Sequence, residues 1–336
     1  MTQTTTTPDS SANRTLVHYD VRDGVAYLKL DDPPANTYTH EMMRALDEGI
    51  LKARFDKDVH VIVITGAGEK MFCAGANINM LKASDPYFKY FFCLHANETL
   101  SRLEQTPKLV IAALNGNTVG GGLEIAMAAD LRIARKGGGK VGLPEVTLGV
   151  LPGTGGTQRL VRIVGKSRAI ELMVTGRLFS FEDALGYGIV DSILEGDDFM
   201  GQVHEYAKQF CPPNKAAKAV GRIKRAVQSG AEIPFESAMT LERELQQQLF
   251  QSDDAHAASA DTSPSAEEQA LWDRSIRVYE RGRTRSLAIA ERYGVPAVYF
   301  WQPLRAHLEP ESPARQLAQD ITAPTINITD AMDDVG

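Results

Sequence analysis

Three consecutive glycines stand directly before an apolar run that contains an acidic residue, and this pattern could stabilise a developing negative charge. Residues 120–122 are glycine, and Glu124 follows within an apolar run that continues to residue 129. Glycine lets another molecule approach the backbone closely, and the first turn of a helix presents N–H groups that lack partners within the helix. The segment therefore predicts a helix start whose backbone N–H groups hold an oxyanion. On its own, such a run more often marks tight packing beside a solvated acid.

A second acidic residue, Glu145, stands in a similar setting. It follows Leu143 and Pro144, and another glycine-rich segment comes after it at residues 152–159. Two carboxyl groups in one site can act as a base and an acid, because burial helps to keep a proton on one of them. Taken separately, Glu145 as a solvated loop acid is the commoner case. Considered together, the two acids predict acid and base catalysis beside an oxyanion site.

A third segment places small residues at an expected turn between a strand and a helix. Ala74, Gly75 and Ala76 follow a β-like run and precede Asn77 and Ile78. Only main-chain atoms would act at such a turn, so small side chains would keep the backbone accessible. The segment is therefore a candidate for a second backbone N–H donor, with ordinary turn packing as the alternative.

Four segments together resemble the crotonase superfamily, and specifically the enoyl-CoA hydratase/isomerase family. The resemblance extends over about residues 17–253, and several spaced motifs are far more specific than one short pattern. The segments are FCAGANI from residue 72, NGNTVGGGLEIAMAADLRIA from 115, GLPEVTLGVLPGTGGTQRLVRIVGKSRAIELMVTG from 142 and DALGYGIVD from 183.

The resemblance implies catalytic roles for four residues. The backbone N–H groups of Ala76 and Gly121 would form an oxyanion hole for the thioester carbonyl of an acyl-CoA substrate. Glu124 would help to activate a water molecule, and Glu145 would deliver a proton to C2 of a 2-enoyl thioester. The expected activity is that of an enoyl-CoA hydratase with no metal and no separate cofactor, since coenzyme A is part of the substrate.

The same resemblance implies further contacts with the substrate. Relatives often have Asp where this chain has Asn77, directly after the oxyanion Ala, and often have Lys where it has Asn79. These two differences could change the affinity for CoA and the preferred acyl group. Lys70 matches a position near the CoA phosphates, with a solvated turn residue as the alternative. The expected binding residues are Lys70, Ala74, Gly75, Asn77, Ile78, Gly120, Pro144 and Gly153.

The acyl end of the pocket has its own candidates. Tyr38 lies in a loop that differs from the usual family pattern, and it could narrow this end. An aromatic cluster at Phe88, Tyr90, Phe91 and Phe92 falls in the segment that lines the acyl pocket in relatives. Most of such a cluster is expected to be ordinary core, although a bulky or aromatic acyl group is compatible with it.

Two alternative functions stay open at the level of sequence. Isomerases and lyases occur in the same superfamily, and isomerases generally keep the later acid but lose the earlier one. The presence of both Glu124 and Glu145 therefore favours a hydratase. The other alternative is a non-catalytic binding protein on the crotonase frame, because the usual terminal helix that packs near CoA is missing after residue 254.

The elements that would position these residues follow a repeating pattern. β-like runs at residues 15–21 and 25–30 flank Asp23-Gly24, which is a hairpin signal. Continuous apolar runs at residues 59–65 and 108–114 predict strands that are buried on both faces. Strands that alternate with helices imply an α/β core. The resemblance makes this core a crotonase-like spiral of ββα units with a C-terminal helical region.

The chain is expected to divide into four parts. Residues 1–14 are a polar lead-in that is expected to be disordered, and residues 15–195 are expected to form the spiral core. Residues 196–254 should form a helical region for oligomerisation, and residues 255–336 are an atypical tail of unknown role. In relatives the helical region builds the trimer contact, so the resemblance implies a homotrimer or a dimer of trimers.

Composition argues against several classes of protein. A net charge of −7 disfavours general nucleic-acid binding, which needs clustered cations. No segment approaches the roughly 18 consecutive apolar residues of a membrane span. Three scattered cysteines without metal-ligand spacing indicate reduced thiols. Because the N-terminus also lacks an apolar signal core, we expect a cytoplasmic protein.

Overall fold

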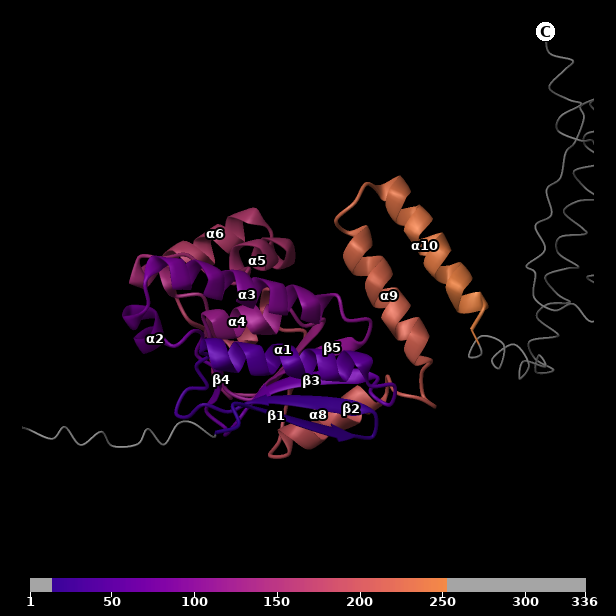
Figure 1. Cartoon of the computed structure of the whole chain (residues 1–336), viewed down its shortest axis with the longest axis horizontal. Helices are drawn as coiled ribbons and strands as arrows, with labels where there is room; N and C mark the ends of the chain where they lie inside the picture. The colour runs from indigo at the N-terminus through magenta and orange to yellow at the C-terminus, as the bar shows by residue number, and fades with distance from the viewer. Residues whose placement is uncertain (1–13, 253–336) are drawn as a thin grey trace, which may run out of the picture. The chain divides into compact units, whose positions relative to one another are not determined.

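The computed structural model of the chain describes residues 14–252, and Figure 1 shows their arrangement. The predictions for residues 1–13 and for the tail from residue 255 lie outside the described residues. Two sheets and the helices around them account for most of what is described. This mixed α/β architecture confirms the predicted fold class.

The first sheet contains six strands, and its order is β1-β2-β3-β5-β7-β10. Strands β1 and β2 form an antiparallel hairpin, while the other pairs are parallel. Asp23 and Gly24 at the hairpin turn both have positive φ, 50° and 78°, as a tight two-residue turn requires. The bounds are β1 (Val17–Arg22), β2 (Val25–Leu30), β3 (Val61–Gly66), β5 (Leu109–Leu114), β7 (Leu131–Arg135) and β10 (Ser192–Leu194).

The second sheet contains four very short strands in the order β4-β6-β8-β9. The chain passes from β3 to β4, from β5 to β6 and from β7 to β8, and so alternates between the two sheets before each helical segment. This alternation produces the predicted spiral of ββα units. The bounds are β4 (Met71–Cys73), β6 (Asn117–Val119), β8 (Lys140–Gly142) and β9 (Phe179–Ser180).

The helices begin where the sequence provides caps. The Thr39 side chain accepts a hydrogen bond from the N–H of Met42 at the start of α1, and Asp85 caps α3, whose first residue is proline. Helices α8, α9 and α10 lie within residues 196–254, which were expected to be helical. The bounds are α1 (His40–Phe55), α2 (Ile78–Ala83), α3 (Pro86–Glu104), α4 (Gly121–Met127), α5 (Gly156–Val164), α6 (Lys166–Thr175), α7 (Phe181–Gly186), α8 (Phe199–Lys208), α9 (Ala217–Gly230) and α10 (Phe235–Phe250).

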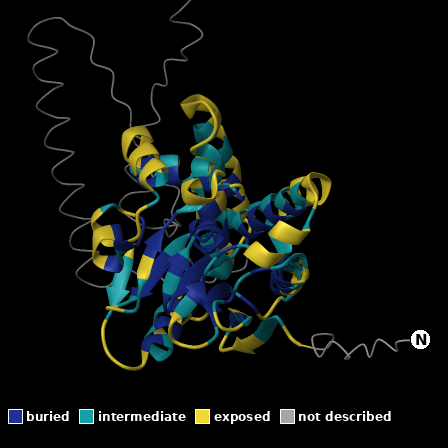
Figure 2. Ribbon diagram, turned by 90° about the vertical axis from the view of Figure 1, so that its left-hand side faces the viewer, coloured by how far each residue is buried: buried dark blue, intermediate teal, exposed yellow. Residues whose placement is uncertain are grey.

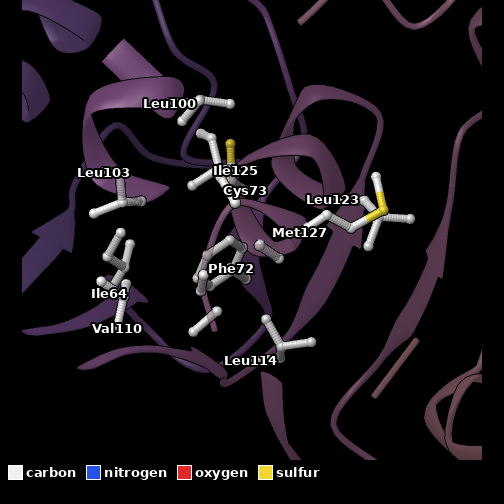
Figure 3. Packing of buried hydrophobic residues seen from close by; sticks show 14 of the residues in the cluster. Ile64, Phe72, Cys73, Leu100, Leu103, Val110, Leu114, Leu123, Ile125 and Met127 are labelled. Carbon is white, nitrogen blue, oxygen red and sulfur yellow. The ribbon is translucent and has the colours of Figure 1, made fainter. Parts of the chain in front are cut away.

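Apolar side chains fill both faces of the first sheet, and Figure 2 shows the buried residues at the centre of the molecule. Every residue of β3 is buried, which explains its continuous apolar sequence. The larger cluster joins the sheet to α1, α3 and α4. Figure 3 shows Phe72 among side chains of α3 and α4. Phe72 thereby anchors β4 directly before the small-residue turn at residues 74–76.

Helix α9 is attached to the core through a buried ion pair. The Lys224 ammonium lies 2.8 Å from a carboxylate oxygen of Asp130 and donates to the carbonyl of Lys108 at 3.0 Å. Asp130 in turn accepts the N–H of Val110 at the start of β5. Helix α10 packs against α9, and Figure 1 shows the two side by side. Across residues 14–252, no helix is both long and apolar enough to span a bilayer.

We expect Lys224→Met to destabilise the fold by about 3 to 5 kcal/mol, because the buried Asp130 carboxylate would lose its charged partner. Urea denaturation followed by circular dichroism would measure this loss. Lys136→Met is the matched control, since the exposed Lys136 pairs with Glu195 in solvent, and we expect it to leave the transition nearly unchanged. Equal effects of the two substitutions would contradict the anchoring role of Lys224.

Candidate active site

Three loops meet at one edge of the second sheet. They follow β4, β6 and β8, which are parallel neighbours, so their carboxyl ends lie together. The loops contain residues 74–77, residues 120–121 and residues 143–145. Crevices at the carboxyl ends of parallel strands are the usual ligand sites of α/β sheets. The topology thus gathers all three sequence segments that were predicted to carry the chemistry.

The backbone N–H groups of Ala76 and of Gly121, the first residue of α4, have no acceptor within the described part of the chain. The two loops touch, because a Cβ built on Gly75 would lie only 2.8 Å from the nitrogen of Gly121. Gly75 also has a φ of 86°, so only glycine fits there without strain. Two adjacent unpaired donors are the arrangement that an oxyanion hole requires.

Glu124 lies one turn into α4 and is only 2 % exposed. Its Oε1 accepts the N–H groups of Thr154 and Gly156, both at 2.7 Å. Burial raises the pKa of Glu124, while these hydrogen bonds oppose that shift by stabilising the carboxylate. The glycine-rich loop before α5 therefore holds Oε1 of Glu124.

Glu145 follows β8 and faces Gly120. A Cβ built on Gly120 would lie 2.9 Å from Oε1 of Glu145, so the carboxyl group lies directly against the glycine turn. Its Oε2 is buried and has no hydrogen-bond partner among the described residues. Burial raises the pKa of Glu145 to about 7, and the nearby charge of Glu124 adds to the shift. Near neutral pH this carboxyl group can therefore hold a proton and release it.

The comparison with known protein families agrees with this geometry. The sequence profile of the enoyl-CoA hydratase/isomerase family matches residues 20–266. The chain belongs to this family. Among curated enoyl-CoA hydratases, the short-chain-enoyl-CoA hydratase of Clostridium acetobutylicum is 36% identical over 231 residues, which cover 68% of this chain and 87% of the relative.

Two further relatives extend the comparison. The (E)-benzylidenesuccinyl-CoA hydratase of Thauera aromatica is 37% identical over 223 residues, which cover 66% of this chain and 85% of that enzyme. A crystal structure of an enoyl-CoA hydratase from Geobacillus kaustophilus is 42% identical and superposes with a TM-score of 0.70. That match covers 73% of this chain and 92% of the solved chain. The enoyl-CoA hydratase/isomerase fold is therefore shared over the described core.

The residues expected to bind substrate lie partly in the three loops and partly away from them. Lys70 is exposed at the opposite end of β4 from Ala76. Asn77 caps α2 by accepting the N–H of Met80, and Ile78 is exposed at the start of that helix. The carbonyl of Gly153 accepts a hydrogen bond from Asn97. Contacts of these residues with a substrate stay predictions.

The prediction that most of the aromatic cluster is core was wrong. Of its four residues, only Phe92 is buried, whereas Phe88, Tyr90 and Phe91 are 36%, 66% and 46% exposed. Helix α3 buries a different stripe, which includes Ala96, Leu100 and Leu103. Its first two turns therefore present aromatic rings at the surface.

Sequence reasoning missed the residues that hold the loop before α5. Thr154 is buried, and its carbonyl accepts a hydrogen bond from Arg159 at 3.0 Å. Arg159 in turn makes a two-pronged ion pair with Glu104 of α3. Arg159 lies in the glycine-rich segment at residues 152–159, but its partner lies in a helix far away in the sequence, so no local pattern indicates the ion pair.

Proposed function

We propose that the protein adds water across the 2,3 double bond of a 2-enoyl-CoA thioester. The observation that supports this most strongly is the pair of unpaired N–H groups, on Ala76 and Gly121, beside the buried Glu124 and the half-buried Glu145. When water attacks C3, negative charge develops on the thioester oxygen. Two fixed donors would stabilise that charge, and one such donor typically contributes about 3 to 4 kcal/mol to the transition state.

The two glutamates would divide the proton transfers. Glu124 accepts two backbone N–H groups, which favours its carboxylate form as the group that orients and deprotonates the water. Glu145, whose pKa is about 7, would hand its proton to C2. The water oxygen bonds to C3 and keeps one hydrogen, Glu124 takes the other, and the proton of Glu145 bonds to C2. Transfer of one proton from Glu124 to Glu145 then restores the starting state. No metal and no separate cofactor enters this scheme.

Hydration of crotonyl-CoA by the full-length protein tests the proposal. We expect the enoyl absorbance to disappear and the product to gain the mass of one water. A panel of longer, branched and aryl enoyl-CoA substrates would define the acyl preference, and a 3-enoyl-CoA would reveal isomerase activity. If no member of the panel reacts while acyl-CoA still raises the melting temperature, the chain is a binding protein instead.

We also propose a cytoplasmic homotrimer or dimer of trimers, with Lys70 near the CoA phosphates. Free thiols at all three cysteines support a reducing compartment. Large apolar side chains on α9, α10 and their connection are exposed, which supports contact with another copy. They are Ile223, Val227, Ile233, Phe235 and Phe250. Light scattering on the purified protein would give the number of copies.

A further inference from the structure

Tyr38 contacts the parts of the site that come from different turns of the spiral. Its N–H donates to the carbonyl of Gly75 at 2.9 Å, and its carbonyl accepts the N–H of Asn77, also at 2.9 Å. Ala76 lies between these two hydrogen bonds, in an isolated parallel bridge with Tyr38. The main chain of Tyr38 therefore fixes the backbone on either side of one proposed oxyanion donor.

The Tyr38 side chain reaches the second proposed donor. Its ring is 2% exposed and lies beside that of Phe92, with the ring centres 5.9 Å apart. A Cβ built on Gly121 would lie 2.2 Å from the Tyr38 hydroxyl oxygen, so the hydroxyl rests directly against Gly121. The tyrosine is thus in contact with the backbone at both donors.

The Tyr38 hydroxyl also reaches the loop that holds the acid Glu124. It shares a hydrogen bond of 3.1 Å with Oγ1 of Thr154. The N–H of Thr154 donates to Oε1 of Glu124, and its carbonyl accepts a hydrogen bond from Arg159. Thr154 is therefore held on one side by the ion-paired Arg159 and on the other by Tyr38.

We propose that Tyr38 is a positioning residue that sets Glu124 in register with the two oxyanion donors by acting through Thr154. This inference rests on the proposed hydration reaction, in which the water over C3 and the thioester oxygen belong to one substrate. An error in the spacing between base and donors would misalign the two ends of that substrate, and small misplacements are costly for rate. Burial raises the pKa of Tyr38 well above its ordinary value, so the hydroxyl stays neutral.

Tyr38→Phe and Tyr19→Phe form a matched pair that tests the proposal. The Tyr38 variant keeps the ring and loses the hydroxyl that joins Thr154. The Tyr19 hydroxyl is also buried but has no hydrogen-bond partner in residues 14–252. We expect Tyr38→Phe to lower kcat about 10-fold and to change KM by no more than about 2-fold. We also expect the acidic limb of the pH profile to move to higher pH, because the Glu124 carboxylate would lose well-aligned hydrogen-bond donors. Tyr19→Phe should change none of these.

Thr154→Val provides the double-mutant cycle, since it removes Oγ1 and keeps the N–H that reaches Glu124. If Tyr38 acts through Thr154, the double variant should be no slower than the slower single variant. Additive losses would overturn the proposal. An unchanged pH profile in Tyr38→Phe would also overturn the proposal. A purely structural role of Tyr38 predicts lower stability but no shift of the acidic limb.

A binding measurement separates failure of this inference from failure of the proposed reaction. Acetoacetyl-CoA forms an enolate that oxyanion donors would stabilise, and its absorbance reports that form. If the wild-type protein hydrates no enoyl-CoA, the proposed function fails, yet the enolate band can still be compared. We expect the band to weaken in Tyr38→Phe and to persist in Tyr19→Phe. Equal bands in the two variants would overturn the role of Tyr38.

Discussion

Replacing Glu145 with glutamine is expected to lower kcat about a thousandfold while acyl-CoA still binds. Glutamine is close in size to glutamic acid, but it has no proton to transfer to C2. The buried Oε2 has no hydrogen-bond partner among residues 14–252, as expected for a carboxyl group that would act on a bound substrate. Stopped-flow hydration of crotonyl-CoA would measure the rate, and titration calorimetry with the saturated butyryl-CoA would measure binding.

The pH profile gives this experiment its sharpest control. Wild-type activity should fall as the pH rises through about 7, because Glu145 then loses its proton. The same raised pKa stabilises the folded protein below the ordinary value of 4.5, and that contribution is lost as the pH rises toward 7. Glu145→Gln should lack both dependences. Glu182→Gln changes an exposed carboxyl group in α7, so it should behave as wild type. Full activity in Glu145→Gln would remove its assigned role.

Gly121→Ala is expected to lower kcat at least about a hundredfold and to lower the melting temperature. Its Cβ would meet the Tyr38 hydroxyl oxygen at 2.2 Å and the ring carbons behind it at 2.7 and 2.8 Å. The tyrosine is buried and cannot move aside, so the start of α4 must shift together with its N–H donor. Loss of one oxyanion donor alone typically costs a factor of about 10² to 10³.

Gly186→Ala is the matched control for this substitution. Gly186 ends α7, and a Cβ built there meets no other atom within 4 Å. We expect unchanged activity and a melting temperature that is equal or slightly higher, because alanine restricts the unfolded chain. If Gly121→Ala kept wild-type kcat while Gly186→Ala behaved as expected, Gly121 could not be an oxyanion donor.

The first sheet could be predicted from the sequence because its strands carry a strong physical signal. Continuous apolar runs such as residues 59–65 reflect a strand covered on both faces, and the structure buries all of β3. The second sheet was missed as strands, because pieces of two or three residues show no periodicity. Helix α8 was not distinguished as a separate element within the expected helical region at residues 196–254, although Phe199, Val203 and Ala207 recur at helical spacing.

The candidate site was predicted from small residues at expected turns, from two acids, and from the resemblance of four segments to one family. Gly75 and Gly121 are required by close approach between loops, so the chemistry leaves a visible trace in the sequence. Tyr38 and Thr154 meet across 116 positions of chain, and neither residue type suggests such a partner in advance. Their contact follows from how β4 and its neighbours align, which only the three-dimensional arrangement shows.

Because the chain alternates between its two sheets, the activity should depend on every part of the spiral being present. The chain passes the candidate site three times, after β4, β6 and β8, and other elements lie between these passes. A fragment that lacks any one of these three segments therefore loses part of the candidate site. The segments between these passes are not free to change, because α3 supplies Phe92, which lies beside the Tyr38 ring, and Glu104, which pairs with Arg159.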